Sequence, residues 1–351
     1  EIFFAHTSFK WANLASHNAG VTVVIVGISK EAKKNRRLFS LADNMESVLK
    51  IVPNINGYLI AAPNVEVTPQ SNASDERATM QFGNHPYYGS ALIFSQDECI
   101  ELHKTDPSAA EFIRPLYGSK EFISSNPRAC LWIRDCDAER AMKIPQIFAR
   151  IEVVRKSRLS AKQDGSAQKL AKSPYRFREQ FVSSKHTTVV PRVSSENRDY
   201  LPVGLLPSNA IIQEKACALY DAPLWNMALI ASRIHWVWIG TVCVRMRTDF
   251  SYSNTLGWNT FPVPKLTATN KADLTRCAED ILLAREAHFP ATIADLYNPA
   301  TMPDNLRAAH ERNDETLERI YIGRCFKNDT ERLEKLFELY TKMTSEKGVT
   351  K

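Results

Sequence analysis

The sequence predicts an α+β protein, in which a mixed β-sheet region is preceded by the last strands of a larger domain and followed by a small all-helical region. Short β-rich runs separated by Pro, Asn and Gly fill the first 265 residues, whereas residues 266–351 carry amphipathic helical patterns. With 351 residues, 44% of them apolar, the chain can bury a sizeable core. We expect three parts, at 1–47, 48–265 and 266–351.

The first part opens with two β-rich runs, at residues 2–4 and 21–28, around a polar loop. An isolated hairpin is only marginally stable. We therefore interpret these runs as the closing strands of a domain whose main body lies upstream.

The middle part alternates short strands and helices. Ser95-x-x-Glu98 is a capping box that begins a helix reaching about residue 104, and Asp137 caps a short helix at 139–142. A longer helix is expected at 144–160, and Leu224–Arg245 has the spacing of one long buried helix. We expect strands or connectors at 48–53, 55–60, 91–94, 112–117, 122–123 and 129–133, a small-residue loop at 165–173, and strands of one sheet at 189–190, 200–205 and 216–219.

The last part follows a predicted linker at 265–271 and contains four helical stretches, at 273–287, 291–297, 303–323 and 329–342. No apolar run approaches the roughly 18–20 residues of a membrane span, and no signal peptide is visible. The seven cysteines are scattered and form no CxxC pair, so we expect reduced thiols in a cytoplasmic protein.

Sequence signatures of catalysis are missing. No two of the 12 glycines stand two residues apart, which excludes every GxG loop, and the eight histidines form no HxH or HExxH. Asn84-His85-Pro86-Tyr87 faintly resembles the Asn-Pro-Pro-Tyr signature of amino-methylating enzymes, but we interpret it as a turn. We therefore expect no catalytic, cofactor-binding or metal-binding residue in this chain.

Positive charge is concentrated in residues 151–200. This segment holds 11 Lys and Arg against 5 Asp and Glu, a net charge of +6, which equals the net charge of the whole chain. Such a stretch, interleaved with Tyr, Phe, Gln, Ser and Asn, is typical of a surface that meets a polyanion. The alternative is a solvated helix followed by a loop. Candidate phosphate ligands are Arg155, Lys156, Arg158, Lys162, Lys169, Lys172, Arg176, Arg178 and Arg192.

An ordered set of short motifs resembles one family, the MmeI-like (type IIL/IIG) restriction–modification DNA adenine methyltransferases. The set includes Phe9-Lys10-Trp11-Ala12-Asn13 and His17-Asn18-Ala19-Gly20 near the start and Leu306-x-x-Ala309-His310 near the end. Between them lie Phe82-Gly83, Gly118-Ser119-x-Glu121-Phe122, Pro191-Arg192-Val193-Ser194-Ser195-Glu196-Asn197-Arg198 and Asn259-x-Phe261-Pro262. One departure is Tyr88-Gly89-Ser90, where the family usually has Asp-Gly-Gly.

The resemblance implies that the chain holds the end of a methyltransferase domain, a DNA target-recognition domain and a helical C-terminal domain. It places the S-adenosylmethionine loop, the catalytic motif and any nuclease upstream, so this chain needs no cofactor of its own. Whether the chain is itself an enzyme stays open. The implied partners are double-stranded DNA and the upstream methyltransferase domain, with no membrane. The alternative is a non-catalytic protein-interaction or scaffold fragment.

Base readout is expected at Glu196, Asn197 and Arg198, with Tyr200 as a further candidate. The resemblance implies that a Glu-x-Arg pair reads part of the target in this region. In an extended segment the two side chains lie on one face, where Glu can accept from a cytosine amine and Arg can donate to guanine. The alternative is a surface β-turn with an internal salt bridge.

Overall fold

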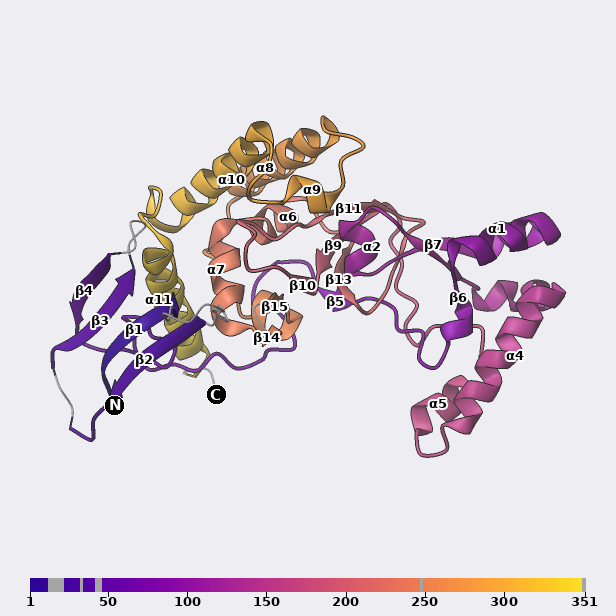
Figure 1. Cartoon of the computed structure of the whole chain (residues 1–351), viewed down its shortest axis with the longest axis horizontal. Helices are drawn as coiled ribbons and strands as arrows, with labels where there is room; N and C mark the ends of the chain where they lie inside the picture. The colour runs from indigo at the N-terminus through magenta and orange to yellow at the C-terminus, as the bar shows by residue number, and fades with distance from the viewer. Residues whose placement is uncertain (12–21, 32–33, 42–45, 247–248, 349–351) are drawn as a thin grey trace, which may run out of the picture.

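The structure is a computed structural model that describes residues 1–11, 22–31, 34–41, 46–246 and 249–348. It is elongated, with one β-sheet at one end, a helical arm at the other and the C-terminal helices along the middle (Figure 1). The predicted loop and motif residues at 12–21 lie outside the described residues.

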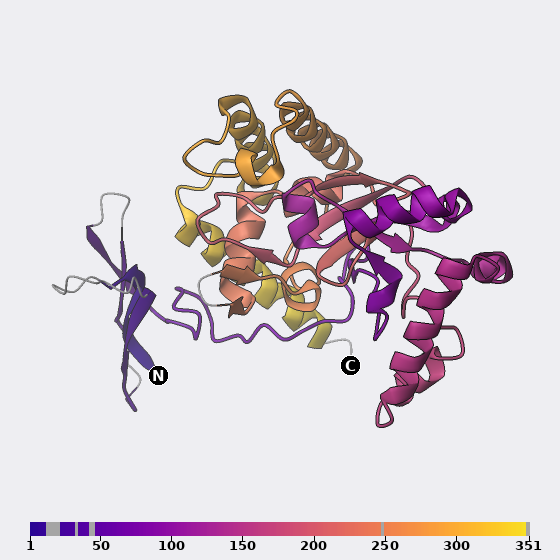
Figure 2. The same cartoon turned by 45° about the vertical axis from the view of Figure 1, so that its right-hand side comes forward.

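The N-terminal sheet has the strand order β2-β1-β3-β4. Its strands are β1 (Ile2–Lys10), β2 (Thr22–Ile28), β3 (Arg36–Leu41) and β4 (Ser47–Val52). The predicted pair of opening strands is confirmed, because β1 and β2 pair antiparallel. β4 pairs with β3, so this sheet continues to Val52, past the expected boundary at residue 47. Figure 2 shows the sheet standing beside the rest of the molecule.

The central sheet has the order β11-β9-β13-β5 and is antiparallel throughout. Its strands are β5 (Gln81–Phe82), β9 (His186–Pro191), β11 (Gly204–Pro207) and β13 (Ala216–Tyr220). The prediction that three of these runs share one sheet is confirmed. A smaller sheet beside it is formed by β10 (Val193–Ser194), β14 (Arg245–Met246) and β15 (Asp249–Ser251).

The outer part of the chain is built on a third sheet, with the order β12-β7-β8-β6. Its strands are β6 (Ile93–Phe94), β7 (Ile113–Tyr117), β8 (Arg128–Leu131) and β12 (Ile211–Ile212). Around it lie α1 (Gln96–Thr105), α2 (Ser119–Ile123), α3 (Ala138–Met142), α4 (Pro145–Ser160) and α5 (Gly165–Leu170), with short 3-10 turns at Ser90–Leu92, Pro107–Phe112 and Asp135–Asp137. The capping box at Ser95 and the long helix α4 confirm the prediction.

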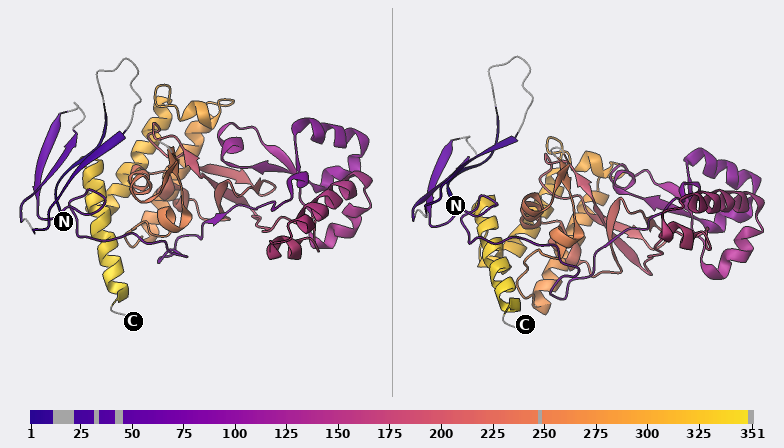
Figure 3. Two further views of the ribbon diagram at one scale, coloured as in Figure 1. Left: turned by 60° about the horizontal axis from the view of Figure 1, so that its bottom comes forward. Right: turned by 90° about the horizontal axis from the view of Figure 1, so that it is seen from below.

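The remaining helices share one core with the central sheet. They are α6 (Trp225–Ile230), α7 (Arg233–Val242), α8 (Ala268–Glu286), α9 (Ile293–Leu296), α10 (Asp304–Ile322) and α11 (Asp329–Gly348), with a π-helical turn at Asn254–Trp258. Trp238, Trp258 and Phe337 are buried together in one cluster that joins the middle part to the C-terminal helices. The last helix also reaches the N-terminal sheet, through the ion pair of Lys50 with Glu334 at 2.6 Å (Figure 3).

Six local predictions were wrong. The helix predicted at 224–245 is broken at Ala231-Ser232, where the Ser232 hydroxyl accepts from the His235 amide and begins a new helix. The predicted loop at 165–173 contains α5, and the predicted linker at 265–271 contains the first turn of α8, capped by Thr267. Residues 55–60 form turns, residues 122–123 are helical, and the strand expected at 200–205 begins only at Gly204.

Candidate nucleic-acid interface

The first part of the basic segment, up to about residue 172, belongs to an arm formed by α4 and α5 that projects from the outer sheet (Figure 1). Four candidate phosphate ligands on it have exposed side chains: Lys156, Lys162, Lys169 and Lys172. Among the described residues, no carboxylate lies within ion-pairing distance of these four ammonium groups. They are therefore free to meet phosphates.

The acidic residues of the same segment are all occupied. Glu152 pairs with Arg155 at 2.9 Å, Glu179 with Arg178 at 2.5 Å and Asp199 with Arg307 at 3.0 Å. The Asp164 carboxylate accepts from the Tyr87 hydroxyl and from two amides at the start of α5. The positive charge of the segment is thus left at the lysines.

Three of the candidate arginines have partners at the surface. Arg155 and Arg178 bond to Glu152 and Glu179, and Arg176 lies 3.4 Å from Asp135. The Arg178 guanidinium also lies 5.0 Å from the centre of the Tyr87 ring. Exposed pairs of this kind contribute little to stability and exchange partners readily. These arginines stay predicted phosphate ligands.

Arg158 does not belong to the surface, contrary to the sequence expectation. Its side chain is fully buried, and burial lowers the pKa of its guanidinium to about 10. The guanidinium donates to six main-chain carbonyls, those of Pro86, Tyr87, Leu170, Ser173, Pro174 and Arg176. Arg158 therefore holds the arm to the loop at 86–89 and cannot reach a phosphate in this structure.

The predicted readout residues lie in a turn between β10 and the central sheet, not in an extended segment. The Arg198 amide donates to the Ser195 carbonyl at 3.3 Å, so Glu196 and Arg198 do not project from one face of a strand. Glu196 pairs with Arg245 of β14 at 2.8 Å, and Arg198 donates to the Ser194 hydroxyl at 3.1 Å. The salt bridge proposed as the alternative is thus formed with β14 instead of within the turn.

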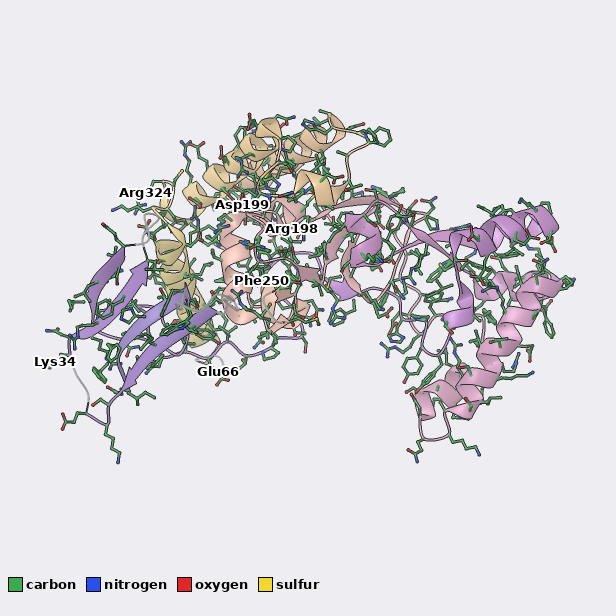
Figure 4. All side chains as sticks on the ribbon, viewed as in Figure 1. Lys34, Glu66, Arg198, Asp199, Phe250 and Arg324 are labelled. Atoms are coloured by element: carbon green, nitrogen blue, oxygen red, sulfur yellow. The ribbon has the colours of Figure 1, made fainter. Side chains whose placement is uncertain are left out.

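Side-chain exposure separates the members of this turn. Asn197 is exposed, and Glu196 and Arg198 are half-buried. Burial lowers the pKa of Arg198, which stays far above neutrality for a guanidinium. Figure 4 shows Arg198 beside Phe250 in the centre of the molecule, away from the α4–α5 arm. The two predicted sites therefore occupy separate parts of the fold.

Tyr200 is removed from the candidate set by its burial. Its ring is 7% exposed and stacks on the His310 ring at 4.1 Å between centroids. Desolvation, with the nearby Asp314, raises the pKa of the Tyr200 hydroxyl. Its ring therefore packs into the core of the C-terminal helices instead of facing a base.

A second group of cations combines Arg192, a predicted phosphate ligand, with three residues that sequence reasoning missed. Arg192, Arg128, Lys120 and Lys215 line a hollow of about 670 Å³ together with Met246. The Arg192 amide donates to the Ser119 hydroxyl, and its guanidinium lies 4.5 Å from the centre of the Phe82 ring. Lys120 lies in α2 and Arg128 in β8, and Arg192 and Lys215 lie in the connections before β10 and β13, so no charge run marks them. The motifs around Ser119 and Arg192 were the only signal.

The described residues contain neither a metal cluster nor a membrane-spanning helix. No group of three or more His, Cys, Asp or Glu within the described ranges is arranged to hold a metal ion. No helix in the part of the chain that the structure describes is long and apolar enough to span a membrane. His235 is buried and its ring lies 3.0 Å from the Tyr252 hydroxyl, so it is a core residue.

Comparison with known proteins identifies the family. Residues 61–265 match the model of the MmeI target recognition domain, residues 266–347 that of the MmeI C-terminal domain, and residues 1–40 that of the MmeI DNA-methyltransferase domain. The chain belongs to the MmeI family. It contains a target-recognition part followed by a C-terminal helical part, and the resemblance noted in the sequence is confirmed.

Two relatives illustrate the extent of the MmeI-family match. DNA methyltransferase A of Bacillus subtilis (strain 168) is 37% identical over 345 residues, which is 98% of this chain and 38% of that protein. The structure of the type IIL restriction–modification enzyme MmeI, solved in complex with DNA, superposes with a TM-score of 0.83 at 29% identity. That match covers 98% of this chain and 46% of MmeI. The chain thus spans less than half the length of either relative.

Proposed function

We propose that this chain is the sequence-specific DNA-recognition module of a longer MmeI-family adenine methyltransferase. The observation that carries the proposal is the pairing pattern of the basic segment. Its carboxylates are engaged within the fold, while four lysines of the arm face solvent with no acidic partner among the described residues. Duplex DNA is a partner with closely spaced negative charge.

Phosphate contact is assigned to the arm and to the hollow around Arg192. Lys156, Lys162, Lys169 and Lys172 supply charge without sequence preference. In the hollow, Lys120, Arg192 and Lys215 supply the cations, and Arg128 pairs with Glu121 of the same lining at 2.9 Å. Together the two groups would fix the position of the duplex along the elongated chain.

Base readout is assigned to Glu196, Asn197 and Arg198. Carboxylate, amide and guanidinium groups have the directional donors and acceptors that distinguish bases in the major groove. The ion pair with Arg245 and the bond to the Ser194 hydroxyl hold two of these side chains in place before DNA arrives. Such preorganisation lowers the entropic cost of binding.

Methyl transfer is assigned to the rest of the longer protein. Within the described residues of the N-terminal sheet, Gly27 is the only glycine, and its Cα lies against the Phe3 and Phe4 rings. In the part of this sheet that the structure describes, nothing fits the glycine-rich loop of an S-adenosylmethionine site, and we propose that this cofactor binds to the rest of the longer protein. We propose the upstream methyltransferase domain as the intramolecular partner and the cytoplasm as the location.

The test is a salt titration of duplex binding by the full-length protein. Changing Lys162, Lys169 and Lys172 together to Glu should weaken binding to all duplexes alike and flatten the slope of log K against log salt by about 3, because each phosphate contact contributes roughly 0.9. The matched control changes Lys265, Lys327 and Lys342, exposed lysines outside the arm, to Glu. Equal behaviour of the two triple variants would leave the arm as a solvated surface.

Sequence readout has its own test. Replacing Glu196 and Arg198 in the full-length protein should change the base accepted at one position of the modified site and leave the others intact. Each good contact contributes about 1–3 kcal/mol of discrimination. Mapping of methylated sites gives the answer, and an unchanged recognition sequence at normal activity would remove the two residues from readout. If the wild-type protein binds no duplex at all, the protein-interaction alternative takes the place of this proposal.

A further inference from the structure

Two successive tyrosines next to the arm have left-handed backbone conformations. The φ angles of Tyr87 and Tyr88 are 46° and 59°. Bulky side chains rarely adopt this region, and it is strained for them. The other non-glycine residues with positive φ among the described residues are single ones: Leu59, Ser125 and Asp221. Strain of this kind persists only where surrounding contacts hold it, and it is concentrated at functional sites.

The contacts that hold this turn come from the arm. The buried Arg158 guanidinium donates to the Pro86 and Tyr87 carbonyls at 2.9 and 3.0 Å. The Tyr87 hydroxyl donates to Asp164, the capping residue of α5, at 2.8 Å, and the Tyr87 amide bonds to the His85 ring at 2.8 Å. The conformation is therefore fixed from both sides before any ligand is present.

The strained turn leaves the aromatic ring of Tyr88 exposed at the surface. Tyr88 is 49% exposed, and its ring stands edge-on to the Tyr87 ring at 5.4 Å between centroids. The neighbouring Tyr87 hydroxyl donates to Asp164, which caps α5, so the turn that carries Tyr88 lies against the arm. A purely ionic surface would have no need for a strained turn that displays a tyrosine.

We propose that the turn Pro86–Gly89 is a DNA contact in which the Tyr88 ring packs against a sugar or base of the duplex, beside the phosphates held by the arm. This rests on the proposed function. Aromatic rings stack on nucleic-acid bases with little sequence preference, and apolar side chains at the groove can wedge between base steps. Tyr88 thus adds apolar affinity to a site otherwise based on charge, and Arg158 is its positioning residue.

The experiment compares Tyr88→Asn, Tyr88→Phe and Phe148→Ala in the full-length protein. Asn tolerates a left-handed φ better than Tyr, so Tyr88→Asn should melt no lower than the wild type. It should nevertheless bind a mixed-sequence duplex about tenfold more weakly, in line with the loss of one stacking contact, with an unchanged salt slope. Tyr88→Phe keeps the ring and should bind like the wild type. Phe148, an exposed ring on α4 of similar exposure at 46%, is the control and should bind normally.

Each other outcome overturns the proposal in its own way. Normal binding by Tyr88→Asn removes the contact. An equal loss in Tyr88→Phe assigns the effect to the hydroxyl, and a flatter salt slope assigns it to a phosphate. A loss that appears only with a lower melting temperature assigns Tyr88 a structural role. Failure of the wild-type protein to bind duplex would instead contradict the proposed function, because the variants could then show no difference.

Discussion

The α4–α5 arm and the C-terminal helices are both rich in charge, but they use it in opposite ways. On the arm, lysines are exposed and lack acidic partners among the described residues. In the C-terminal part, 13 Lys and Arg stand against 15 Asp and Glu, and the charges pair with one another. Glu318 is 2% exposed and binds Arg332, and Arg233 binds Asp329. The two regions therefore differ in the pairing of their charges more than in their charge content, which is why the arm is the part proposed to meet a polyanion.

The C-terminal helix α10 turns its polar residues inward. His310 bonds to the Ala231 carbonyl, Asn313 donates to the Ala228 carbonyl at 2.9 Å, and Asp314 accepts from the Arg233 amide at 2.7 Å. These bonds join α10 to the break between α6 and α7. The C-terminal helices therefore brace the recognition part and share its core, whereas the arm extends away from it.

The largest expected effect is at the one buried charge of the arm. Arg158→Ala should lower the free energy of unfolding by roughly 3–5 kcal/mol, because six main-chain carbonyls lose the guanidinium that donates to them. Lys156→Ala, on the exposed side of the same helix, should change it by less than about 0.5 kcal/mol. Denaturant titration with hydrogen exchange at α5 measures both. Equal values for the two variants would contradict the division of the arm into a structural and a binding side.

A comparable loss is expected in the C-terminal helices. Arg332→Ala leaves the Glu318 carboxylate buried without its guanidinium, and removing one partner of a buried pair costs about 3–5 kcal/mol. Because the Arg332 side chain is partly exposed, we expect the loss in the free energy of unfolding to be about 3 kcal/mol. Arg319→Ala breaks a pair with the exposed Glu315 and should cost about 0.5 kcal/mol or less. Thermal and urea unfolding would show whether burial makes this difference.

Asp314 should make the C-terminal helices pH-sensitive. Burial, together with the charge of Glu318, raises its pKa from 3.8 to about 7, against the opposing effects of Arg233, Tyr200 and Arg332. A carboxyl with a raised pKa stabilises the fold below pH 4 and loses this contribution as the pH rises toward 7. Asp314→Asn should remove that slope and be more stable than the wild type at pH 8, by roughly 2–4 kcal/mol.

The control for this pH effect is Glu315→Gln on the exposed face of the same helix. Its unfolding free energy should follow that of the wild type at every pH. If Asp314→Asn also follows the wild type between pH 4 and 8, then Asp314 is ionised in the folded protein across this range.

The smallest effect is expected at the cap of α5. Asp164→Ala removes the acceptor for two amides and for the Tyr87 hydroxyl and should cost about 1 kcal/mol. Asp164→Asn keeps the cap and should cost only a few tenths. Hydrogen exchange of the α5 amides is the appropriate measurement, because the opening is local. A global loss in both variants would show that the arm depends on the charge itself.

Local sequence was sufficient for much of the fold. The β-rich runs in residues 1–30, the capping box at Ser95 and the α4 helix were predicted, because alternation, caps and helical spacing are local properties. The break at Ser232 was not predicted, because the apolar pattern continues through it. The Ala231 carbonyl, which is free at the break, bonds to His310 of α10, a contact that only the tertiary structure shows. The short helix α5 was hidden in a small-residue stretch that resembles a loop.

The sequence by itself determined the family, the order of the parts and the place of the excess charge, because the order of motifs and the local composition are properties of the linear chain. Only the tertiary structure decided which charges are available. Arg158 and Lys162 are close in sequence and carry the same charge, yet one is buried among carbonyls and the other is exposed. Likewise, Glu196 meets Arg245 and Tyr200 meets His310 across the fold. Burial and pairing depend on residues distant in the chain, so no local pattern encodes them.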